Sequence, residues 1–318
     1  MENRKKCISI MVPTYNEEEN VVPLCEAIMA EFAKSLPQYD YEIVFIDNCS
    51  KDSTREKLTM LCDTYPHVRA IFNARNFGQF NSPYHGICQT TGDCTIPVCA
   101  DFQDPIEMIP QLVAKWEEGY KIVCAVKTAS EENKLVRFLR TCYYKLIRKM
   151  SSAEQIEHFT GFGLYDRSFV DVLRELDDPT PFIRGIVAEL GFAKIEVPYL
   201  QAKRRAGKTS NNFHTLYDAA MLSFTTYTKT PIRLFLALGC ALMALSFLGA
   251  GALLVLSLLR VKFEELLWLV PVISFFASLN LVSVGILGEY VLMLRSKIMR
   301  RPLVIEEKRL NFDKQDRD

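Results

Sequence analysis

The sequence has no excess of charge of either sign, because 38 basic and 38 acidic residues cancel in a chain of 318 residues. A strongly basic chain attracts nucleic acid through the field of its whole surface, and this chain has no such field. A nucleic-acid partner would need a local basic patch. We therefore expect no nucleic-acid partner.

The ten cysteines have neither the spacing of a disulfide framework nor that of a metal site. Nine of them are spread irregularly between Cys7 and Cys142, and no secretory signal precedes them. Cys94 and Cys99 do not form a Cys-x-x-Cys pair and have no nearby histidine partner. We expect the cysteines to be small buried apolar residues in a reducing cytosol.

Two long apolar runs stand near the C-terminus, at residues 232–259 and 266–294. Each exceeds the roughly 20 residues that a helix needs to cross a bilayer. The alternative, two buried helices of a soluble core, would usually leave a polar face. Only residues 260–265 separate the runs, so we expect a tight transmembrane hairpin with both outer ends on one side.

Basic residues set the expected orientation of this hairpin. Lys229 and Arg233 precede the first run, and four basic residues follow the second: Arg295, Lys297, Arg300 and Arg301. The positive-inside rule places these ends, and everything N-terminal to them, in the cytoplasm. Arg260 and Lys262 in the short loop weaken the asymmetry without reversing it.

Residues 209–230 carry aromatic and apolar side chains at helical spacing, which indicates an amphipathic helix on the membrane surface. An ordinary helix packed on the globular domain is the alternative.

The first two hundred residues alternate short β-branched runs with helical patterns. Such alternation predicts an α/β fold with a mainly parallel sheet, whose ligands gather at the carboxyl ends of the strands. We expect helices at 18–35 and 54–65. The expected strands are 7–12, 41–46, 68–72, 95–99 and 122–126.

Acidic clusters follow two of these strands, at residues 47–52 and in the stretch Pro-Val-Cys-Ala-Asp-Phe-Gln-Asp-Pro, residues 97–105. Asp101 and Gln103 alternate along an extended chain, so both can face one hard cation, and Asp104 could reach it through a turn. Acidic residues at a strand end are also often solvated or cap the next helix. Asp104-Pro105 resembles such a helix start.

Four segments occur in the order found in glycosyltransferase family 2: residues 12–18 (Val-Pro-Thr-Tyr-Asn-Glu-Glu), 47–52, 74–78 (Ala-Arg-Asn-Phe-Gly) and 97–105. With the predicted hairpin and the tail from Gly288 to Leu303, the chain resembles the polyprenyl-phosphate glycosyltransferases of that family. The likeness extends over nearly the whole chain.

This resemblance implies a GT-A fold that transfers a hexose, with inversion, from a nucleotide-diphosphate sugar to a polyprenyl phosphate. UDP is favoured over GDP as the nucleotide. It assigns donor binding to Pro13, Tyr15, Glu17, Asp47 and Arg75. It also assigns catalysis to Asp101 and Asp104 and a Mg²⁺ or Mn²⁺ ion to Asp101 and Gln103.

The chain departs from the family pattern at two places. Cys99 stands where the family commonly has an aspartate, and a thiol is a poor ligand for a hard cation, so we expect Cys99 to be a packing residue. Gly161-Phe162-Gly163-Leu164 replaces a Gly-Asp-Phe-Arg-Leu segment, which removes an Asp/Arg pair. Residues 160–163 are interpreted as a flexible loop beside the sugar or as a simple turn.

A lipid phosphate is already anionic at neutral pH, so it needs cations rather than a base. The candidates that could hold it are Lys127, Arg137, Arg140, Arg204 and Arg205. For Arg137 and Arg140, a solvated or lipid-facing basic surface is the alternative.

The predicted organisation is a GT-A domain (1–208), a surface helix (209–230), two transmembrane helices (231–295) and a cytoplasmic tail (296–318). Both termini and the catalytic domain are expected on the cytoplasmic face of the inner membrane, and a homo-oligomer is left open. One alternative is a processive polysaccharide synthase, but its Gln-x-x-Arg-Trp segment and additional membrane helices are missing. The other is a non-catalytic scaffold that binds a sugar nucleotide, suggested by Cys99 and the missing Asp/Arg pair.

Overall fold

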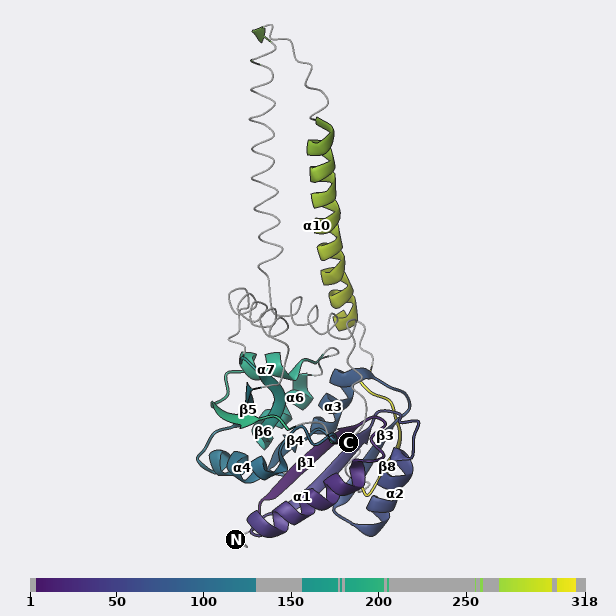
Figure 1. The fold of residues 1–318 in the computed structure, drawn as a ribbon, viewed down its shortest axis with the longest axis vertical. Helices are drawn as coiled ribbons and strands as arrows, with labels where there is room; N and C mark the ends of the chain where they lie inside the picture. The colour runs from purple at the N-terminus through teal and green to yellow at the C-terminus, as the bar shows by residue number, and fades with distance from the viewer. Residues whose placement is uncertain are drawn as a thin grey trace.

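An eight-stranded mixed sheet organises the molecule, with the strands in the order β7-β5-β6-β4-β1-β2-β3-β8 (Figure 1). The computed structural model describes residues 4–129, 156–176, 178, 181–202, 205, 255, 258–259, 269–298 and 302–312. The strands are β1 (Cys7–Thr14), β2 (Asp40–Asp47), β3 (Val68–Asn73), β4 (Cys94–Pro97), β5 (Ile122–Ala129), β6 (Phe159–Asp166), β7 (Lys194–Leu200) and β8 (Glu306–Leu310). The helices are α1 (Val21–Ser35), α2 (Thr54–Thr64), α3 (Gly78–Cys88), the short 3₁₀ helix η1 (Ile106–Met108), α4 (Ile109–Glu117), α6 (Arg167–Leu176), α7 (Ile183–Glu189) and α10 (Leu269–Ile298).

The first four strands form the parallel part of the sheet. Strand β1 pairs in parallel with β2 on one side and with β4 on the other, and β3 extends the sheet beyond β2. The chain therefore winds outward from β1 to β3 and then returns to the opposite side of β1. This reversal creates a switch point between β1 and β4, where open α/β sheets bind ligands. The predicted α/β class with a mostly parallel sheet is confirmed.

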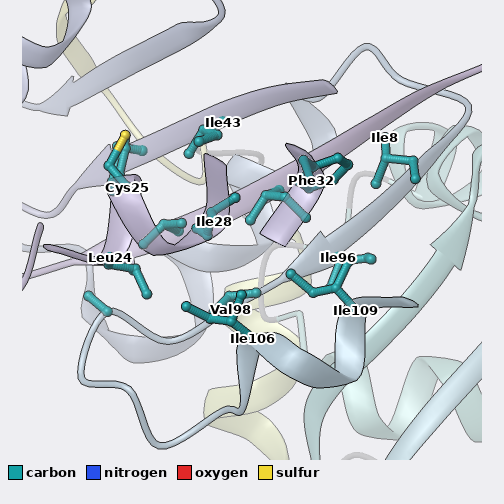
Figure 2. Packing of buried hydrophobic residues seen from close by; sticks show 14 of the residues in the cluster. Ile8, Leu24, Cys25, Ile28, Phe32, Ile43, Ile96, Val98, Ile106 and Ile109 are labelled. Carbon is teal, nitrogen blue, oxygen red and sulfur yellow. The ribbon is translucent and has the colours of Figure 1, made fainter. Parts of the chain in front are cut away.

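Both faces of the parallel strands are buried, which explains their nearly continuous apolar sequence. Ile8, Ile10 and Val12 of β1 belong to one core cluster and Met11 to the other, because neighbouring residues of a strand point to opposite faces. Figure 2 shows the first cluster, in which Leu24, Ile28 and Phe32 of α1 pack against Ile8, Ile43 and Ile96 of the sheet. The positions of α1 and of the loop that precedes it are fixed by this packing.

Residues 160–163 lie in strand β6, so the expectation of a loop or turn is wrong. Strand β6 is antiparallel to β4 and β5. A Cβ atom on Gly163 would lie 2.2 Å from the carbonyl oxygen of Val123, and Gly161 has a φ of +105°. Glycine at 163 is thus required by the close approach of two strands, a reason that the sequence alone did not reveal.

Helix α10 has 30 residues and coincides with the second predicted membrane run. It extends away from the sheet domain (Figure 1) and exposes apolar side chains, among them Val284, Leu287 and Val291. Taken over the residues that the structure describes, no helix has the length and hydropathy needed to span a bilayer. Nearly all of the first run, and the whole of the predicted surface helix, lie outside the described residues, so both stay predictions.

The C-terminal segment returns to the sheet, which the prediction of a simple tail did not foresee. Strand β8 pairs antiparallel with the edge strand β3, and Asn311 donates hydrogen bonds to the carbonyl oxygens of Cys62 and Val68. Glu306 contacts His85 of α3, with 2.5 Å between Oε1 and Nε2, and also binds Arg309. This segment therefore covers an edge that would otherwise expose unpaired backbone groups.

The contacts of Glu306 predict that its contribution to the stability of the protein depends on pH. Burial would raise the pKa of its carboxyl group, but hydrogen bonds from His85 and Arg309 lower the pKa to about 2, from an ordinary value of 4.5. A lowered folded-state pKa stabilises the protein above pH 4.5, and this contribution disappears as the pH falls through about 2.

We expect Glu306→Gln to reduce the free energy of unfolding by about 2 kcal/mol at neutral pH and progressively less below pH 4.5. Denaturant unfolding between pH 7 and pH 3 measures the difference. Glu26→Gln on the exposed side of α1 is the control and should change little. A difference that is constant over this range would contradict the assigned pKa.

Candidate active site

The loop after β1 and the turn after β2 are hydrogen-bonded to each other at the carboxyl edge of the sheet. The backbone N–H of Asn16 donates to Ser50 Oγ at 2.8 Å, and that of Glu17 donates to Thr54 Oγ1 at 2.9 Å. In the other direction, the N–H of Lys51 donates to Asn16 Oδ1 at 2.8 Å. The first two segments of the predicted donor site thus form one unit.

The predicted donor residues of the first segment differ in exposure. Pro13 is half-buried within β1, whereas Tyr15 is 37 % exposed at the edge of the sheet. Glu17 is half-buried, and its Oε2 accepts a hydrogen bond from Asn20 Nδ2 at 2.6 Å. Tyr15 therefore offers an aromatic surface to a ligand, while Glu17 also stabilises the start of α1.

Asp47 is completely buried and is held by the turn that follows it. Its Oδ2 lies 2.8 Å from Nε of Arg55, in the first turn of α2, and also accepts the N–H of Ser50 at 3.1 Å. Because no part of its side chain is exposed, Asp47 here supports the turn that follows β2. Its predicted contact with the donor stays a prediction.

Asn48 connects this turn to the third predicted segment. Its Oδ1 accepts the N–H of Phe77 at 2.9 Å, and its Nδ2 donates to Asn76 Oδ1 at 3.0 Å and to the carbonyl oxygen of Gly78 at 3.2 Å. The guanidinium of Arg75 stays exposed and lies 4.1 Å from the centre of the Phe77 ring. Arg75 is thus presented at the same edge as Tyr15 and the Asp47 turn.

The acidic cluster lies beyond β4, beside the switch point. Asp101 and Asp104 are each only 5 % exposed. Asp101 Oδ1 accepts the N–H of Gln103 at 3.1 Å, which is the local turn that aspartate favours. Asp104 turns toward the protein, because its Oδ2 accepts the N–H of Cys99 at 3.0 Å and its Oδ1 accepts the hydroxyl of Tyr199 at 3.4 Å.

The two carboxylates therefore have different surroundings. Burial raises the pKa of Asp104, and the negative charge of Asp101 acts in the same direction, while the N–H of Cys99 and the positive charge of Lys127 oppose the shift. No side-chain hydrogen bond from Asp104 caps η1. Asp104 thus supports the loop that presents Asp101, and its predicted catalytic role stays a prediction.

Cys99 is exposed, so its predicted role as a packing residue is wrong. Its neighbours Val98 and Ala100 are buried, and its thiol lies beside the buried carboxyl group of Asp104, with which it forms a hydrogen bond. Buried cysteines elsewhere fit the expectation: burial raises the pKa of Cys25 and of Cys62 to about 12, which keeps both thiols neutral.

Cations of the predicted acceptor set lie near the acidic cluster. The backbone N–H of Arg205 donates to the carbonyl oxygen of Asp101 at 3.3 Å, and its guanidinium lies 5.1 Å from the centre of the Phe102 ring. Lys127 is half-buried near the end of β5, and its charge acts on Asp104. Arg137, Arg140 and Arg204 lie outside the described residues.

Three residues of this site were missed by the sequence analysis: Asn48, Arg55 and Tyr199. Asn48 lies within a segment that was quoted, and the ability of its amide to join two loops depends on their folded arrangement. Tyr199 reaches Asp104 from a strand 95 residues away in the chain. Only the sheet order brings these two together, so no local sequence signal identifies the pair.

Comparison with known proteins identifies the family of this chain. Residues 9–174 match the model of glycosyl transferase family 2. This chain belongs to that family, and it is a glycosyltransferase with a GT-A-like mixed, mostly parallel sheet.

The relatives match nearly end to end. A prophage bactoprenol glucosyl transferase homolog of Escherichia coli is 32 % identical over 94 % of this chain and 97 % of its own length. The bactoprenol glucosyl transferase of Shigella phage SfII is 32 % identical over 95 % and 97 %, respectively. Among solved structures, the mannosyltransferase PcManGT from Pyrobaculum calidifontis in complex with GDP-Man and Mn2+ is 15 % identical, with a TM-score of 0.45, and the match covers 94 % of this chain and 89 % of that one.

Asn48→Ala should destabilise the contact between the turn after β2 and the loop after β3. It removes the acceptor of the Phe77 N–H and the donor to two loop oxygens. We expect the free energy of unfolding to fall by roughly 2 kcal/mol, as for a buried polar group that loses its partner. Asn48→Asp keeps the acceptor and should lose less. Denaturant unfolding compares the two variants, and equal losses would show that the acceptor contact does not matter.

Proposed function

We propose that this protein transfers a hexose, with inversion, from a nucleotide-diphosphate sugar to a polyprenyl phosphate at the cytoplasmic face of the membrane. The observation that carries this proposal is the nearly full-length similarity to relatives named bactoprenol glucosyl transferases. UDP-glucose is therefore the first donor to test. The product is a lipid-linked sugar.

The donor binds at the carboxyl edge of β1, β2 and β3. Tyr15 is exposed where an aromatic ring can stack on a nucleobase, and the loop of Arg75 is tied through Asn48 to the turn after β2. The exposed guanidinium of Arg75 suits the diphosphate. Support for this site is the convergence of three separate segments on one edge.

A divalent cation, Mg²⁺ or Mn²⁺, would be held by Asp101 and Gln103. Both offer the oxygen ligands that hard cations prefer, and the Gln103 N–H fixes the orientation of the Asp101 carboxylate. In the described parts of the chain, no three His, Cys, Asp or Glu side chains gather to hold a metal, so the donor's phosphates and water would complete the coordination. When bound, such an ion neutralises the charge that develops on the leaving diphosphate.

The chain's own residues position the acceptor. The lipid phosphate is anionic, so one of its oxygens attacks the anomeric carbon without a protein base, and the bond from that carbon to the diphosphate breaks. Arg205 lies next to Asp101, because its backbone N–H donates a hydrogen bond to the carbonyl oxygen of Asp101. Its guanidinium can guide the acceptor phosphate toward the sugar.

Membrane attachment follows from the two apolar runs of the sequence. The return of β8 to the sheet supports an orientation in which both ends of the hairpin face the same side as the catalytic domain, because β8 and β3 belong to one sheet. The inner membrane, with the domain in the cytoplasm, is the proposed location. Polyprenyl phosphate would reach the site from that bilayer.

Purified full-length protein should glycosylate polyprenyl phosphate in the presence of Mg²⁺ or Mn²⁺, assayed with a panel of UDP- and GDP-hexoses.

Asp101→Asn should reduce transfer by about two orders of magnitude or more, because an amide cannot neutralise the charge on a metal-bound diphosphate. Cys99→Ala should be mild. Absence of transfer with every donor would favour the scaffold alternative, and near-normal activity of Asp101→Asn would contradict the metal assignment.

Arg205→Ala should raise the KM for polyprenyl phosphate about tenfold or more, as expected when a charge-assisted phosphate contact worth roughly 1.5 to 3 kcal/mol is lost. The KM for the donor should change little. Arg205→Lys should rescue partly, because it keeps the charge and loses the two-pronged geometry. Arg4→Ala, at an exposed position three residues before β1, is the control. Weaker donor binding with an unaltered lipid requirement would instead place Arg205 at the donor diphosphate.

A further inference from the structure

The C-terminal strand β8 and the residue before it, Ile305, contact residues that support two loops of the proposed donor site. The backbone N–H of Ala74 donates to the carbonyl oxygen of Ile305 at 2.9 Å, at the start of the loop that presents Arg75. Glu307 Oε2 lies 3.0 Å from Nη1 of Arg55, the residue that holds Asp47. One short segment, more than two hundred residues away in sequence, therefore touches the supports of two donor loops.

Arg55 distributes its hydrogen bonds among three acceptors from different elements. Its Nε binds Asp47 at 2.8 Å, its Nη2 donates to the carbonyl oxygen of Asn73 at 2.9 Å, and its Nη1 binds Glu307. The guanidinium also lies over the ring of Phe72, 5.2 Å from its centre. A planar guanidinium with all three of these contacts has little freedom to rotate.

The three charged side chains of this arrangement differ in burial, and Asp47 is the most deeply buried. Asp47 has no exposed side-chain surface, whereas the side chains of Arg55 and Glu307 are 29 % and 56 % exposed. A fully buried carboxylate depends on its charged partner, because an unpaired charge is costly to bury. The geometry of Arg55 therefore controls the geometry of the Asp47 turn, and Glu307 is the outermost contact that fixes Arg55.

We propose that β8 acts as a positioning strap for the donor pocket, in which Glu307 orients Arg55 and Arg55 orients the Asp47 turn for the nucleoside diphosphate. This rests on the proposed function of that pocket. Glu307 and Arg55 are positioning residues, because they act through Asp47. The strap begins eight residues after Ile298, the last residue of α10, so the segment next to a proposed membrane helix helps to shape the nucleotide site.

The affinity of the full-length protein for UDP tests the strap, with GDP measured in parallel and used instead if it is the nucleotide that binds. Glu307→Gln should weaken nucleotide binding roughly two- to fivefold, as suits the loss of a partly exposed ion pair. Arg55→Lys keeps a charge beside Asp47 but loses the fork, and it should weaken binding about tenfold. Lys308→Gln, at an exposed neighbouring position of the same strand, is the matched control and should bind normally.

Two readouts separate positioning from general stability. In transfer assays, Glu307→Gln should raise the KM for the donor while kcat and the KM for polyprenyl phosphate change little, and its Tm should stay near that of the wild type. In the Arg55→Lys background, Glu307→Gln should add little, because the contact it removes is already broken.

Unchanged nucleotide affinity in both single variants would overturn the proposed positioning role of β8. The same holds if the variants lower the Tm without any change in nucleotide affinity or in the KM for the donor. The proposal would also be overturned if the fold-losses of nucleotide affinity in the two single variants multiplied in the double variant, because the two residues would then act independently. Wild-type protein that binds neither UDP nor GDP would overturn the donor assignment itself together with the strap. Wild-type binding with unaffected variants would overturn the strap alone.

Discussion

Parallel pairing of β1 with both β2 and β4 is the constraint on which the remaining structure depends. Because β1 is flanked on both sides and buried on both faces, the chain must leave and re-enter the sheet around it, and the reversal places the loops after β1, β2, β3 and β4 at one edge. The apolar residues of α1 then fix the helix against this strand. Side chains that bind or transfer a sugar can gather at that edge without any of them belonging to the core.

The loops at this edge are shaped mainly by their own polar side chains. Asn16, Asn48 and Asp101 each accept backbone N–H groups of nearby loop residues. Such contacts satisfy the backbone where it leaves the sheet, which regular pairing can no longer do. As a result, the residues that present Tyr15 and Arg75 are held by a second set of polar residues beneath them. Asp47 and Asp104, both buried, belong to that supporting set in this structure.

The alternation of apolar strands and amphipathic helices was enough to predict the α/β class and the positions of β1, β2, β3 and β5, because burial on both faces leaves a strong sequence signal. The family segments also identified the loops of the candidate site. What could not be predicted depends on contacts between distant parts of the chain. Gly161 and Gly163 suggested a turn, yet both lie in β6, where Gly163 allows two strands to approach closely. Cys99 was expected to pack in the protein, but it lies just beyond β4 and is exposed. The pairing of β8 with β3 joins residues 240 apart, as in Ala70 and Leu310, and nothing in the charged sequence of β8 marks it as a strand.

The late position of β8 in the chain affects the order in which the protein can be completed during synthesis. The ribosome makes the N-terminal part first, and domains generally begin to fold as they emerge. Strands β1 to β7 are available by residue 200, but the edge of β3 stays uncovered until both apolar runs have been synthesised. The nascent enzyme would thus acquire its final sheet edge only after its hydrophobic segments have left the ribosome. The contacts of β8 with Ala74 and Arg55 therefore form only after both apolar runs have been synthesised.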